Sequence, residues 1–336
     1  MTLSQAFQPT LRVAHLRTEF TTQAGVVRAV DDVSFTVMPG QIMGLVGESG
    51  SGKSMTGYSI MGLIDQPGKV VSGSVQLRGQ ELRGLPAEAM RKIRGDRIAM
   101  IFQDPMMTLN PVLRIDTQMM EAVVAHHDVS QDTARALCRD ALARVGIPSP
   151  DERLLAYPHQ FSGGMRQRVA IAIALLNKPD LIICDEPTTA LDVTIQGQIL
   201  YEMQKLCRES GTALIWITHD LSVVAGLADT VCVMYAGKIV ESGTVQQVLE
   251  QPRHPYTHGL IASAPSRNPR GQPLRQIRGM TPSLLNLPTG CAFRERCDSA
   301  TAVCQDTPEL HEQNGRTLRC FHPVQTLAET LLAQEL

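Results

Sequence analysis

The first part of the chain has the short, alternating apolar runs that are typical of β-strands. Apolar and polar positions alternate through residues 11–20 and 26–37, and the apolar run IMGLV follows soon afterwards. Gly25 and the Pro39-Gly40 pair separate these runs, and both are turn signals. The pattern therefore predicts that sheet comes before helix in this chain.

After residue 54 the pattern changes to longer amphipathic segments that alternate with short apolar runs. The predicted elements are a helix at 55–64, strands at 72–79 and 97–103, amphipathic helices between about 115 and 145, a helix at 163–176, a strand at 181–185, a helix at 193–208, a strand at 213–218, a short helix at 220–227 and a strand at 230–237. The alternation in the later half predicts a parallel sheet that is covered by helices.

The composition fits a folded protein with more than one domain. The chain has 336 residues, of which 43% are hydrophobic and 19% are charged, and its formal net charge is −2. A single core stops growing beyond roughly 250 to 300 residues, and the global basic field that nucleic-acid binding usually needs is missing. No apolar run approaches the roughly 18 residues of a spanning helix, and the first residues lack a secretory signal pattern. These features predict a cytosolic or peripheral protein.

The composition changes after about residue 250. Seven prolines lie between Pro252 and Pro288, which indicates a linker or a surface extension rather than a continuation of the sheet. We therefore predict one domain over residues 1–250 and an extension over residues 251–336.

Residues 47–54 (GESGSGKS) fit the pattern G-x-x-x-x-G-K-[ST] and lie between an apolar strand and a predicted helix. Glycines let a loop curl its N–H groups around a polyphosphate, and the helix presents its positive end to the same anion. Lys53 can reach the β- and γ-phosphates, and Ser54 can bind Mg²⁺. A glycine-rich turn that binds nothing is the simpler alternative, but such a match arises by chance on the order of 10⁻⁵ per position. The loop therefore predicts a nucleotide site.

A second carboxylate-bearing element is the apolar strand LIICD, which ends at Asp185 and is followed by Glu186. Asp185 is placed to hold Mg²⁺, directly or through water, and Glu186 can accept a proton from an attacking water. An acidic pair after a strand is by itself usually only a turn. In a parallel sheet, however, this strand and the glycine-rich loop open at the same carboxyl edge, so we expect the two sites to meet there.

The segment FSGGMRQR, shortly before the acidic strand, resembles the signature segment of ABC-type ATPases. Ser162 and the N–H groups of Gly163 and Gly164, at the start of a helix, make an anion site. In that family the site contacts the γ-phosphate held by the opposite subunit, so the resemblance implies that ATP lies between two ATPase domains. Phe161 and Met165 stand where the general family has Leu and Gln, and we interpret them as a subfamily variant.

The remaining elements of that family follow in order along the chain. Gln103 resembles the loop glutamine that contacts Mg²⁺ or the attacking water. The segment Ala190-Leu191-Asp192 resembles the one that crosses the dimer interface. His219 resembles the histidine that contacts the γ-phosphate and holds the general base in position. Phe20 resembles the aromatic residue that stacks on adenine, although a core or surface phenylalanine is a competing interpretation.

The resemblance therefore implies a complete hydrolytic site. The expected catalytic residues are Glu186, His219, Gln103 and Lys53. The expected ATP-binding residues are Phe20, Gly47, Glu48, Ser49, Gly50, Ser51, Gly52, Lys53, Ser54 and Met55, with Ser162, Gly163, Gly164 and Asp192 contacting the ATP of the partner. The expected Mg²⁺ ligands are Ser54, Gln103 and Asp185. The implied fold is an α/β P-loop ABC ATPase domain, with a mixed core sheet, an antiparallel β subdomain and an α-helical subdomain at about 104–165, followed by a small cysteine-containing extension.

The segment RHPYT at 253–257 and the cysteine-bearing tail resemble the ATP-binding subunits of bacterial dipeptide, oligopeptide and nickel importers. The segments SM…IMGLI and QDPMMTLNP resemble the first, D-type ATPase subunit of dipeptide permeases more than the second. The resemblance implies a peripheral ATPase on the cytoplasmic face of the inner membrane. Its implied partners are a second related ATPase, two permease subunits and an extracytoplasmic solute-binding protein, with no nucleic acid.

Two other functions stay open at this stage. The same ATPase subunit could serve the import of nickel chelates or glutathione, because the residues that select the solute belong to other chains. An ABC ATPase that acts on DNA or ribosomes is a different class, but such proteins generally carry a coiled-coil insertion or two ATPase units, and neither is visible in this sequence.

Four of the eight cysteines, Cys291, Cys297, Cys304 and Cys320, cluster in the extension. Four thiolates can bind tetrahedral Zn²⁺ or a [4Fe–4S] cluster. The short C-x2-4-C knuckle of structural zinc sites is absent, and the wide spacing resembles that of the iron–sulfur cluster in some members of this subfamily. We therefore expect a [4Fe–4S] cluster, with Zn²⁺ as the alternative. Four unligated thiols are least favoured, because a small tail with little core needs a staple.

Overall fold

The computed structural model describes residues 8–104, 108–188, 191–264, 268, 271 and 273–325. The strands are β1 (Leu11–Thr22), β2 (Gly25–Val37), β3 (Ile42–Val46), β4 (Gly68–Leu77), β5 (Gln80–Glu81), β6 (Ile98–Ile101), β7 (Leu181–Asp185), β8 (Ala213–Thr218), β9 (Thr230–Tyr235), β10 (Lys238–Thr244), β11 (His311–Gln313) and β12 (Arg316–Leu318). The α-helices are α1 (Lys53–Met61), α2 (Ala87–Ile93), α4 (Ile115–Val124), α5 (Gln131–Arg144), α6 (Pro150–Leu154), α7 (Gly163–Leu175), α8 (Val193–Ser210), α9 (Leu221–Leu227) and α10 (Pro255–Ala262).

An eight-stranded sheet forms the centre of the molecule, in the order β11-β12-β10-β9-β3-β8-β7-β6. Strands β9, β3, β8, β7 and β6 are parallel, as the alternating pattern predicted. In the register of these strands, Val46 of β3 pairs with Thr218 of β8, and Asp185 of β7 pairs with Ile217. Because these strands end at the same level, the loops that follow β3, β7 and β8 all leave from one edge of the sheet.

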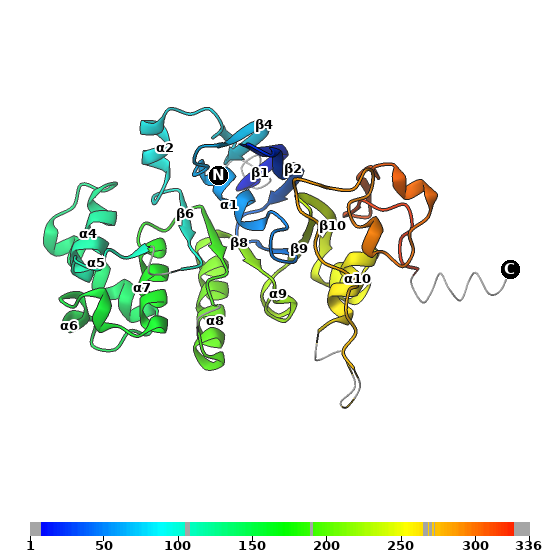
Figure 1. The fold of residues 1–336 in the computed structure, drawn as a ribbon. Helices are drawn as coiled ribbons and strands as arrows, with labels where there is room; N and C mark the ends of the chain where they lie inside the picture. The colour runs from blue at the N-terminus through cyan, green and yellow to red at the C-terminus, as the bar shows by residue number, and fades with distance from the viewer. Residues whose placement is uncertain are drawn as a thin grey trace.

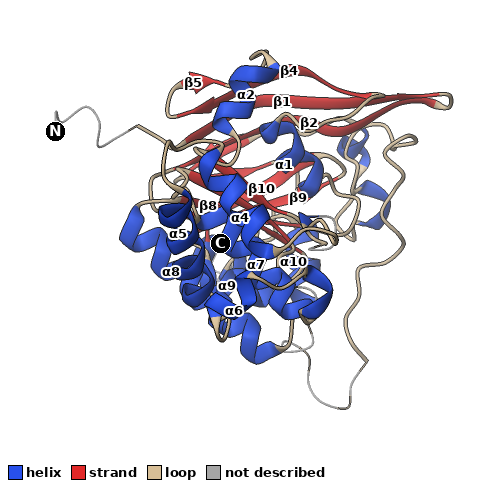
Figure 2. Cartoon of the chain, turned by 90° about the vertical axis from the view of Figure 1, so that its left-hand side faces the viewer, coloured by secondary structure: helices blue, strands red, loops and turns tan. Residues whose placement is uncertain are grey.

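Side chains on the two faces of this sheet enter two different cores. On one face, Ile183 and Ile215 pack with α1 and with the antiparallel sheet β2-β1-β4-β5. On the other face, Ile182, Leu214 and Trp216 pack with α4, α5, α7 and α8. The alternation follows from the two-residue period of a strand. Figure 2 shows the strands above and the larger group of helices below. The mixed central sheet, the antiparallel sheet and the helical region agree with the expected ABC ATPase fold.

The C-terminal extension contributes two strands to the central sheet, so the prediction that it would not continue the sheet is wrong. Glu241 of β10 pairs with Leu318 of β12, and β11 pairs with β12 in turn. A third core joins Val231 and Val233 of β9 to Tyr256 and Phe293 of the extension. Figure 1 shows the extension on one side of the central sheet and α4 to α7 on the other. The tail is thus packed onto the ATPase, and the boundary at residue 250 stays a prediction.

Several differences from the predicted elements have simple physical reasons. The predicted helix at 55–64 ends at Met61, because Gly62 adopts a left-handed conformation with φ of 65° that caps it. Helix α2 was missed because it is seven residues long and buries only Met90 and Ile93. Strands β11 and β12 have three residues each, which is too short for a periodic signal. None of the helices in the described part of the chain has the length and apolar character needed to cross a bilayer.

Candidate nucleotide-binding and hydrolysis site

The loop between β3 and α1 has a backbone shape that only glycine adopts without strain at three positions. Gly47, Gly50 and Gly52 have φ angles of 155°, 77° and 103°. A Cβ atom would lie 2.3 Å from the carbonyl oxygen of Met234 at Gly47, and 2.3 Å from that of Ala29 at Gly52. At Gly50 no atom lies within 4 Å of the Cβ position. The loop is therefore packed at both ends and open in the middle, as a phosphate cradle requires.

Lys53, the first residue of α1, folds its side chain back across this loop. Its Nζ donates hydrogen bonds of 2.9 Å to the backbone oxygens of Gly47 and Glu48. The residue is only 6% exposed, and burial lowers the pKa of its ammonium group, although the carboxylates of Glu186, Asp185 and Glu48 act in the opposite direction. The structure therefore holds this cation over the loop, where its charge can meet phosphate oxygens.

Ser54 and Asp185 form a pair of oxygen ligands beside the loop. The Ser54 hydroxyl donates a 2.9 Å hydrogen bond to Oδ1 of Asp185, and burial raises the pKa of that carboxyl. Tyr58 lies near enough to lower this pKa, but Oδ2 of Asp185 is buried without a hydrogen-bond partner within the described ranges. Hydroxyl and carboxylate oxygens are ligands that Mg²⁺ prefers, and a buried, unpartnered carboxylate oxygen is costly without a cation. These two residues therefore fit a magnesium site.

Glu186 directly follows β7 and is held by residues from two other segments of the chain. Its φ of 46° is a left-handed conformation, and its N–H donates to Ile217 of β8 at 2.9 Å. Oε1 lies 3.1 Å from Nδ1 of His219, and Gln103 donates from Nε2 to Oε2 at 3.2 Å. The structure thus brings together the three polar residues that were expected to handle the attacking water. Gln103 contacts Glu186 in this structure, whereas the sequence predicted it as a magnesium ligand.

The Ser-Gly-Gly segment lies on the surface at the start of α7. Ser162 is the N-cap of the helix, and its hydroxyl accepts a 3.3 Å hydrogen bond from the N–H of Met165. Ser162 and Gly163 are exposed, and no atom lies within 4 Å of the position that a Cβ would take at Gly163. Backbone N–H groups at a helix start are favourable for an anion, and here they are accessible to another molecule.

Asp192 has a local structural role that is independent of a partner subunit. It is the exposed N-cap of α8 and accepts a 3.0 Å hydrogen bond from the N–H of Ile195. Ala190, in the same predicted interface segment, lies outside the described residues. The contact of Asp192 with a partner's nucleotide stays a prediction.

Phe20, Met55 and Ser49 are three further residues that the resemblance implied for ATP binding. Phe20 is half-buried on β1, where it packs closely on Gly68, since a Cβ there would lie 2.5 Å from Cε1 of Phe20. Met55 is half-buried against the core below the antiparallel sheet. Ser49 is exposed at the tip of the loop. Packing alone explains Phe20, so its contact with adenine stays a prediction.

Glu48 of the loop contacts residues of the extension that the sequence did not single out. Its backbone N–H donates to the hydroxyl of Tyr256 at 2.8 Å. Its carboxylate accepts hydrogen bonds from both terminal nitrogens of Arg296, at 2.6 and 2.9 Å, and one from Thr281 at 3.0 Å. These partners lie more than 200 positions away along the chain, and no local pattern in the sequence connects them to the loop.

The four cysteines of the extension lie in one region but do not form a ready metal site. Burial raises the pKa values of Cys291 and Cys297, and it raises that of Cys320 to about 12; the other thiols lie close enough to contribute to this last shift. The N–H of Cys291 also donates to the backbone oxygen of Cys304 at 3.0 Å. Within the described ranges, however, no three His, Cys, Asp or Glu side chains are arranged to hold a metal ion. The predicted [4Fe–4S] cluster is therefore not confirmed, and neither is the zinc alternative.

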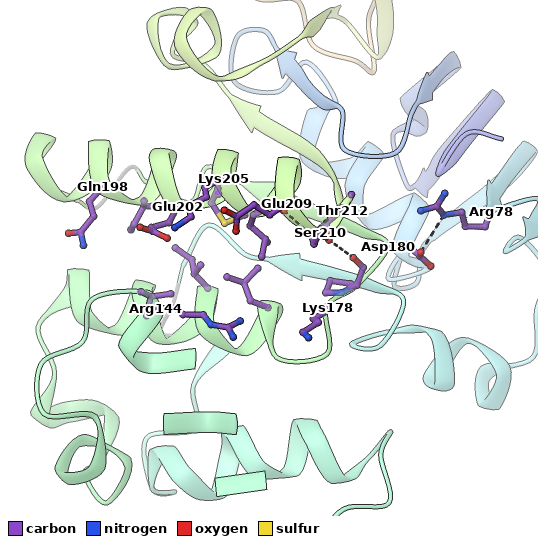
Figure 3. Close-up of a pocket in the computed structure, with 18 residues that line it drawn as sticks. Arg78, Arg144, Lys178, Asp180, Gln198, Glu202, Lys205, Glu209, Ser210 and Thr212 are labelled. Atoms are coloured by element: carbon purple, nitrogen blue, oxygen red, sulfur yellow. Dashed lines mark hydrogen bonds and ion pairs between the residues drawn. The ribbon is translucent and has the colours of Figure 1, made fainter. Parts of the chain in front are cut away.

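A cavity of about 670 Å³ lies between α7 and α8, at the edge of the sheet where β7 and β8 begin. Figure 3 shows that its rim carries charges of both signs, including Arg144, Lys178, Glu202 and Glu209. The phosphate loop, Asp185 and Glu186 leave from the opposite edge, where β3 and β7 end. The cavity is therefore separate from the candidate nucleotide site.

Comparisons with known proteins agree with this geometry. Residues 30–189 match the model of the "ABC transporter" family, and residues 240–304 match that of the "Oligopeptide/dipeptide transporter, C-terminal region" family. The chain is 47% identical to the oligopeptide transport ATP-binding protein OppD of Escherichia coli (strain K12) over 318 residues, which covers 94% of both chains. It is 49% identical to the dipeptide transport ATP-binding protein DppD of Bacillus subtilis (strain 168), over 93% of this chain and 94% of that protein.

A solved structure shares the fold of the ATPase part. The dimeric, post-hydrolysis structure of the ATP-binding cassette MJ0796, bound to ADP and Pi, superposes with a TM-score of 0.65 at 26% identity, and the match covers 70% of this chain and 98% of that one. These matches show that the chain is an ATPase of the ABC type, which uses ATP and Mg²⁺. The chain belongs to the ABC transporter family, in its branch of oligopeptide and dipeptide importer ATP-binding subunits.

Proposed function

We propose that this chain binds Mg-ATP on residues 47–54 and hydrolyses it with Glu186 as general base, and that the reaction powers peptide uptake through separate permease subunits. The position of Glu186 is the main observation that supports this proposal. Gln103 and His219 hold its carboxylate at the sheet edge from which the phosphate loop leaves. A general base in that place can take a proton from a water that attacks the γ-phosphate.

Each of the other residues has a separate task in this mechanism. The N–H groups of the loop and the ammonium of Lys53 bind and orient the phosphates. Ser54 and Asp185 would hold Mg²⁺, which would supply positive charge to offset that of the phosphates. His219 and Gln103 orient Glu186 and its water. Because phosphoryl transfer depends mainly on positioning and charge stabilisation, each of these contacts should affect the rate more than the fold.

We infer that the working unit contains two ATPase subunits. The exposed Ser162 and Gly163 support this inference, since they offer an anion site that a nucleotide on another subunit can reach. The structurally similar cassette MJ0796 is described as dimeric. In the proposed complex, the second ATPase is a related but different chain, and the pair associates peripherally with two permeases at the cytoplasmic face of the inner membrane. A solute-binding protein on the outer side delivers the substrate.

We propose dipeptides or oligopeptides as the solutes. The family match of residues 240–304 and the names of the relatives OppD and DppD support peptides over nickel chelates or glutathione. The complete complex, reconstituted in liposomes with ATP supplied on the ATPase side, should accumulate radiolabelled peptide. Unlabelled peptide should compete, and a nickel chelate or glutathione should not. Accumulation of a nickel chelate or glutathione without peptide uptake would contradict the proposed solute but leave the ATPase assignment intact.

We also propose that the extension binds an iron–sulfur cluster through Cys291, Cys297, Cys304 and Cys320. The gathering of four thiols in one small region supports this proposal, while their arrangement in the structure would have to tighten on binding. Protein purified without oxygen should contain about four iron and four sulfide per chain and absorb broadly near the blue end of the spectrum. Stoichiometric zinc, or no metal, would contradict the proposal.

A further inference from the structure

The phosphate loop is held from outside by two different parts of the chain. On the side of Gly52, the N–H of Gly237, in the turn between β9 and β10, donates to the backbone oxygen of Ser51 at 2.9 Å. On the side of Gly47, the contacts come from the extension, through Tyr256 and Arg296. The extension therefore forms part of the support of the nucleotide loop and not only a domain beside it.

The contact with Tyr256 determines which N–H groups of the loop can bind phosphate. The N–H of Glu48 is already bonded to the Tyr256 hydroxyl at 2.8 Å. Tyr256 itself is fully buried and packs against the ring of Tyr235, with ring centroids 4.6 Å apart. The buried Tyr256 thus fixes the first part of the loop. The N–H of Ser51 also donates within the loop, to the backbone oxygen of Glu48 at 3.2 Å, so the cradle for phosphate consists of the other N–H groups that follow Glu48.

The contact with Arg296 controls a negative charge at the rim of the cradle. Burial alone would raise the pKa of the Glu48 carboxyl, but the hydrogen bonds from Arg296 and Thr281 lower it overall. Glu48 therefore carries a full charge close to Lys53, whose pKa it also affects. A free carboxylate here would repel a triphosphate, and it would compete with the phosphates for Lys53 and for the N–H groups of the loop.

The Arg296 side chain is also held by contacts other than its bond to Glu48. Its side chain is only 6% exposed, and its Nε donates to the backbone oxygen of Arg278 at 3.0 Å. Its guanidinium also lies over the rings of Tyr235 and Phe293, at 5.8 and 5.9 Å from the ring centroids. A guanidinium that is stacked and bonded in this way presents its two remaining nitrogens in a fixed orientation, which suits two-pronged binding of one carboxylate.

We propose that Arg296 is a positioning residue for ATP binding: its two-pronged bond to Glu48 turns that carboxylate away from the phosphate cradle and neutralises it. The proposal rests on the assignment of residues 47–54 as the phosphate loop. It gives the extension a defined part in nucleotide binding, since this chain completes the support of its own loop with a residue 248 positions away.

The test compares full-length variants in the assembled complex, by the KM for ATP, by kcat and by binding of a fluorescent ATP analogue. Arg296→Ala should raise KM and the dissociation constant about tenfold, with kcat changed less than about threefold, because ground state and transition state lose the same binding. Arg294→Ala is the matched control, since Arg294 lies on the same short helix (Arg294–Arg296) and its side chain has no hydrogen bond to the loop in the described structure. This control should behave as the wild type.

A second variant tests whether ATP binding is weakened by the freed Glu48 carboxylate or by the loss of a bond that attaches the loop to the extension. If the freed carboxylate is what harms binding, then Glu48→Gln combined with Arg296→Ala should restore KM to within about threefold of the wild type, because neighbouring substitutions that share one contact are not additive. A double variant as weak as Arg296→Ala, or a single variant with wild-type KM, would overturn the proposal.

A third variant keeps the test informative if Arg296→Ala fails to fold. Arg296→Lys keeps the positive charge but loses the two-pronged bond, so it should give an intermediate KM. A wild-type KM in this variant would contradict the proposal that the two-pronged bond of Arg296 positions the Glu48 carboxylate. The proposal for Arg296 requires that residues 47–54 are the phosphate loop. Lys53→Ala tests that assignment separately, because Lys53 does not belong to the extension.

Discussion

Replacement of Glu186 by Gln is expected to lower the rate of ATP hydrolysis by at least about 100-fold, the size of effect that loss of a general base produces. ATP binding is expected to change by less than about threefold, because the phosphates are held by the loop and by Lys53 rather than by this carboxylate. Glutamine has almost the same shape as glutamate and can keep hydrogen bonds to Gln103 and His219. It cannot, however, accept the proton of the attacking water.

The measurement for this variant combines phosphate release with nucleotide binding in the purified complex. Glu209→Gln is a suitable control, because Glu209 is exposed on α8 and lies at the separate cavity between α7 and α8. The control should hydrolyse ATP at the wild-type rate. Unchanged hydrolysis in Glu186→Gln would exclude Glu186 as the base, and loss of binding in that variant would show that the substitution disturbs the phosphate site itself.

Replacement of Lys53 by Ala is expected to weaken ATP binding by about 10- to 100-fold, since hydrogen bonds to charged groups contribute about 1.5 to 3 kcal/mol each. The side chain bonds to the backbone oxygens of Gly47 and Glu48 across the loop, so its loss removes both the positive charge and a contact that closes the loop. Hydrolysis should fall with it, because the γ-phosphate loses a cation that stabilises the transition state.

Titration with a fluorescent ATP analogue measures this effect directly. Lys92→Ala removes an exposed lysine from α2 and should leave the affinity unchanged. A thermal unfolding curve close to that of the wild type would show that Lys53→Ala acts at the site and not through the fold. If Lys53→Ala bound ATP as tightly as the control, residues 47–54 would not be the phosphate loop.

The parts of the site that lie next to strand ends were predictable from the sequence. Residues 47–54, Asp185 and His219 each follow a short apolar run, and parallel strands bring such ends to one edge of a sheet. The structure confirms that arrangement, since Val46 pairs with Thr218 and Asp185 with Ile217. The strands at 42–46, 181–185 and 213–218 were found at their observed positions because each is a short, continuous apolar run that is buried along its whole length.

The contribution of the extension could not be predicted in the same way. The pairing of β12 with β10 involves only two residue pairs, Glu241 with Leu318 and Ser242 with Thr317, and short strands have no readable period. The bond of Arg296 to Glu48 depends on tertiary packing around Tyr235 and Phe293. The sequence analysis did not single out Arg296, because no local pattern in the sequence connects this residue to a loop 248 positions away.

A cryo-EM map of the assembled complex that carries Glu186→Gln, prepared with Mg-ATP, would test the proposed ATP site between two ATPase subunits. We predict that each nucleotide is enclosed between two ATPase subunits, with Ser162 of this chain within hydrogen-bond distance of a γ-phosphate whose lysine belongs to the neighbouring ATPase. A closed complex in which Ser162 and the N–H groups of α7 contact no nucleotide would contradict it.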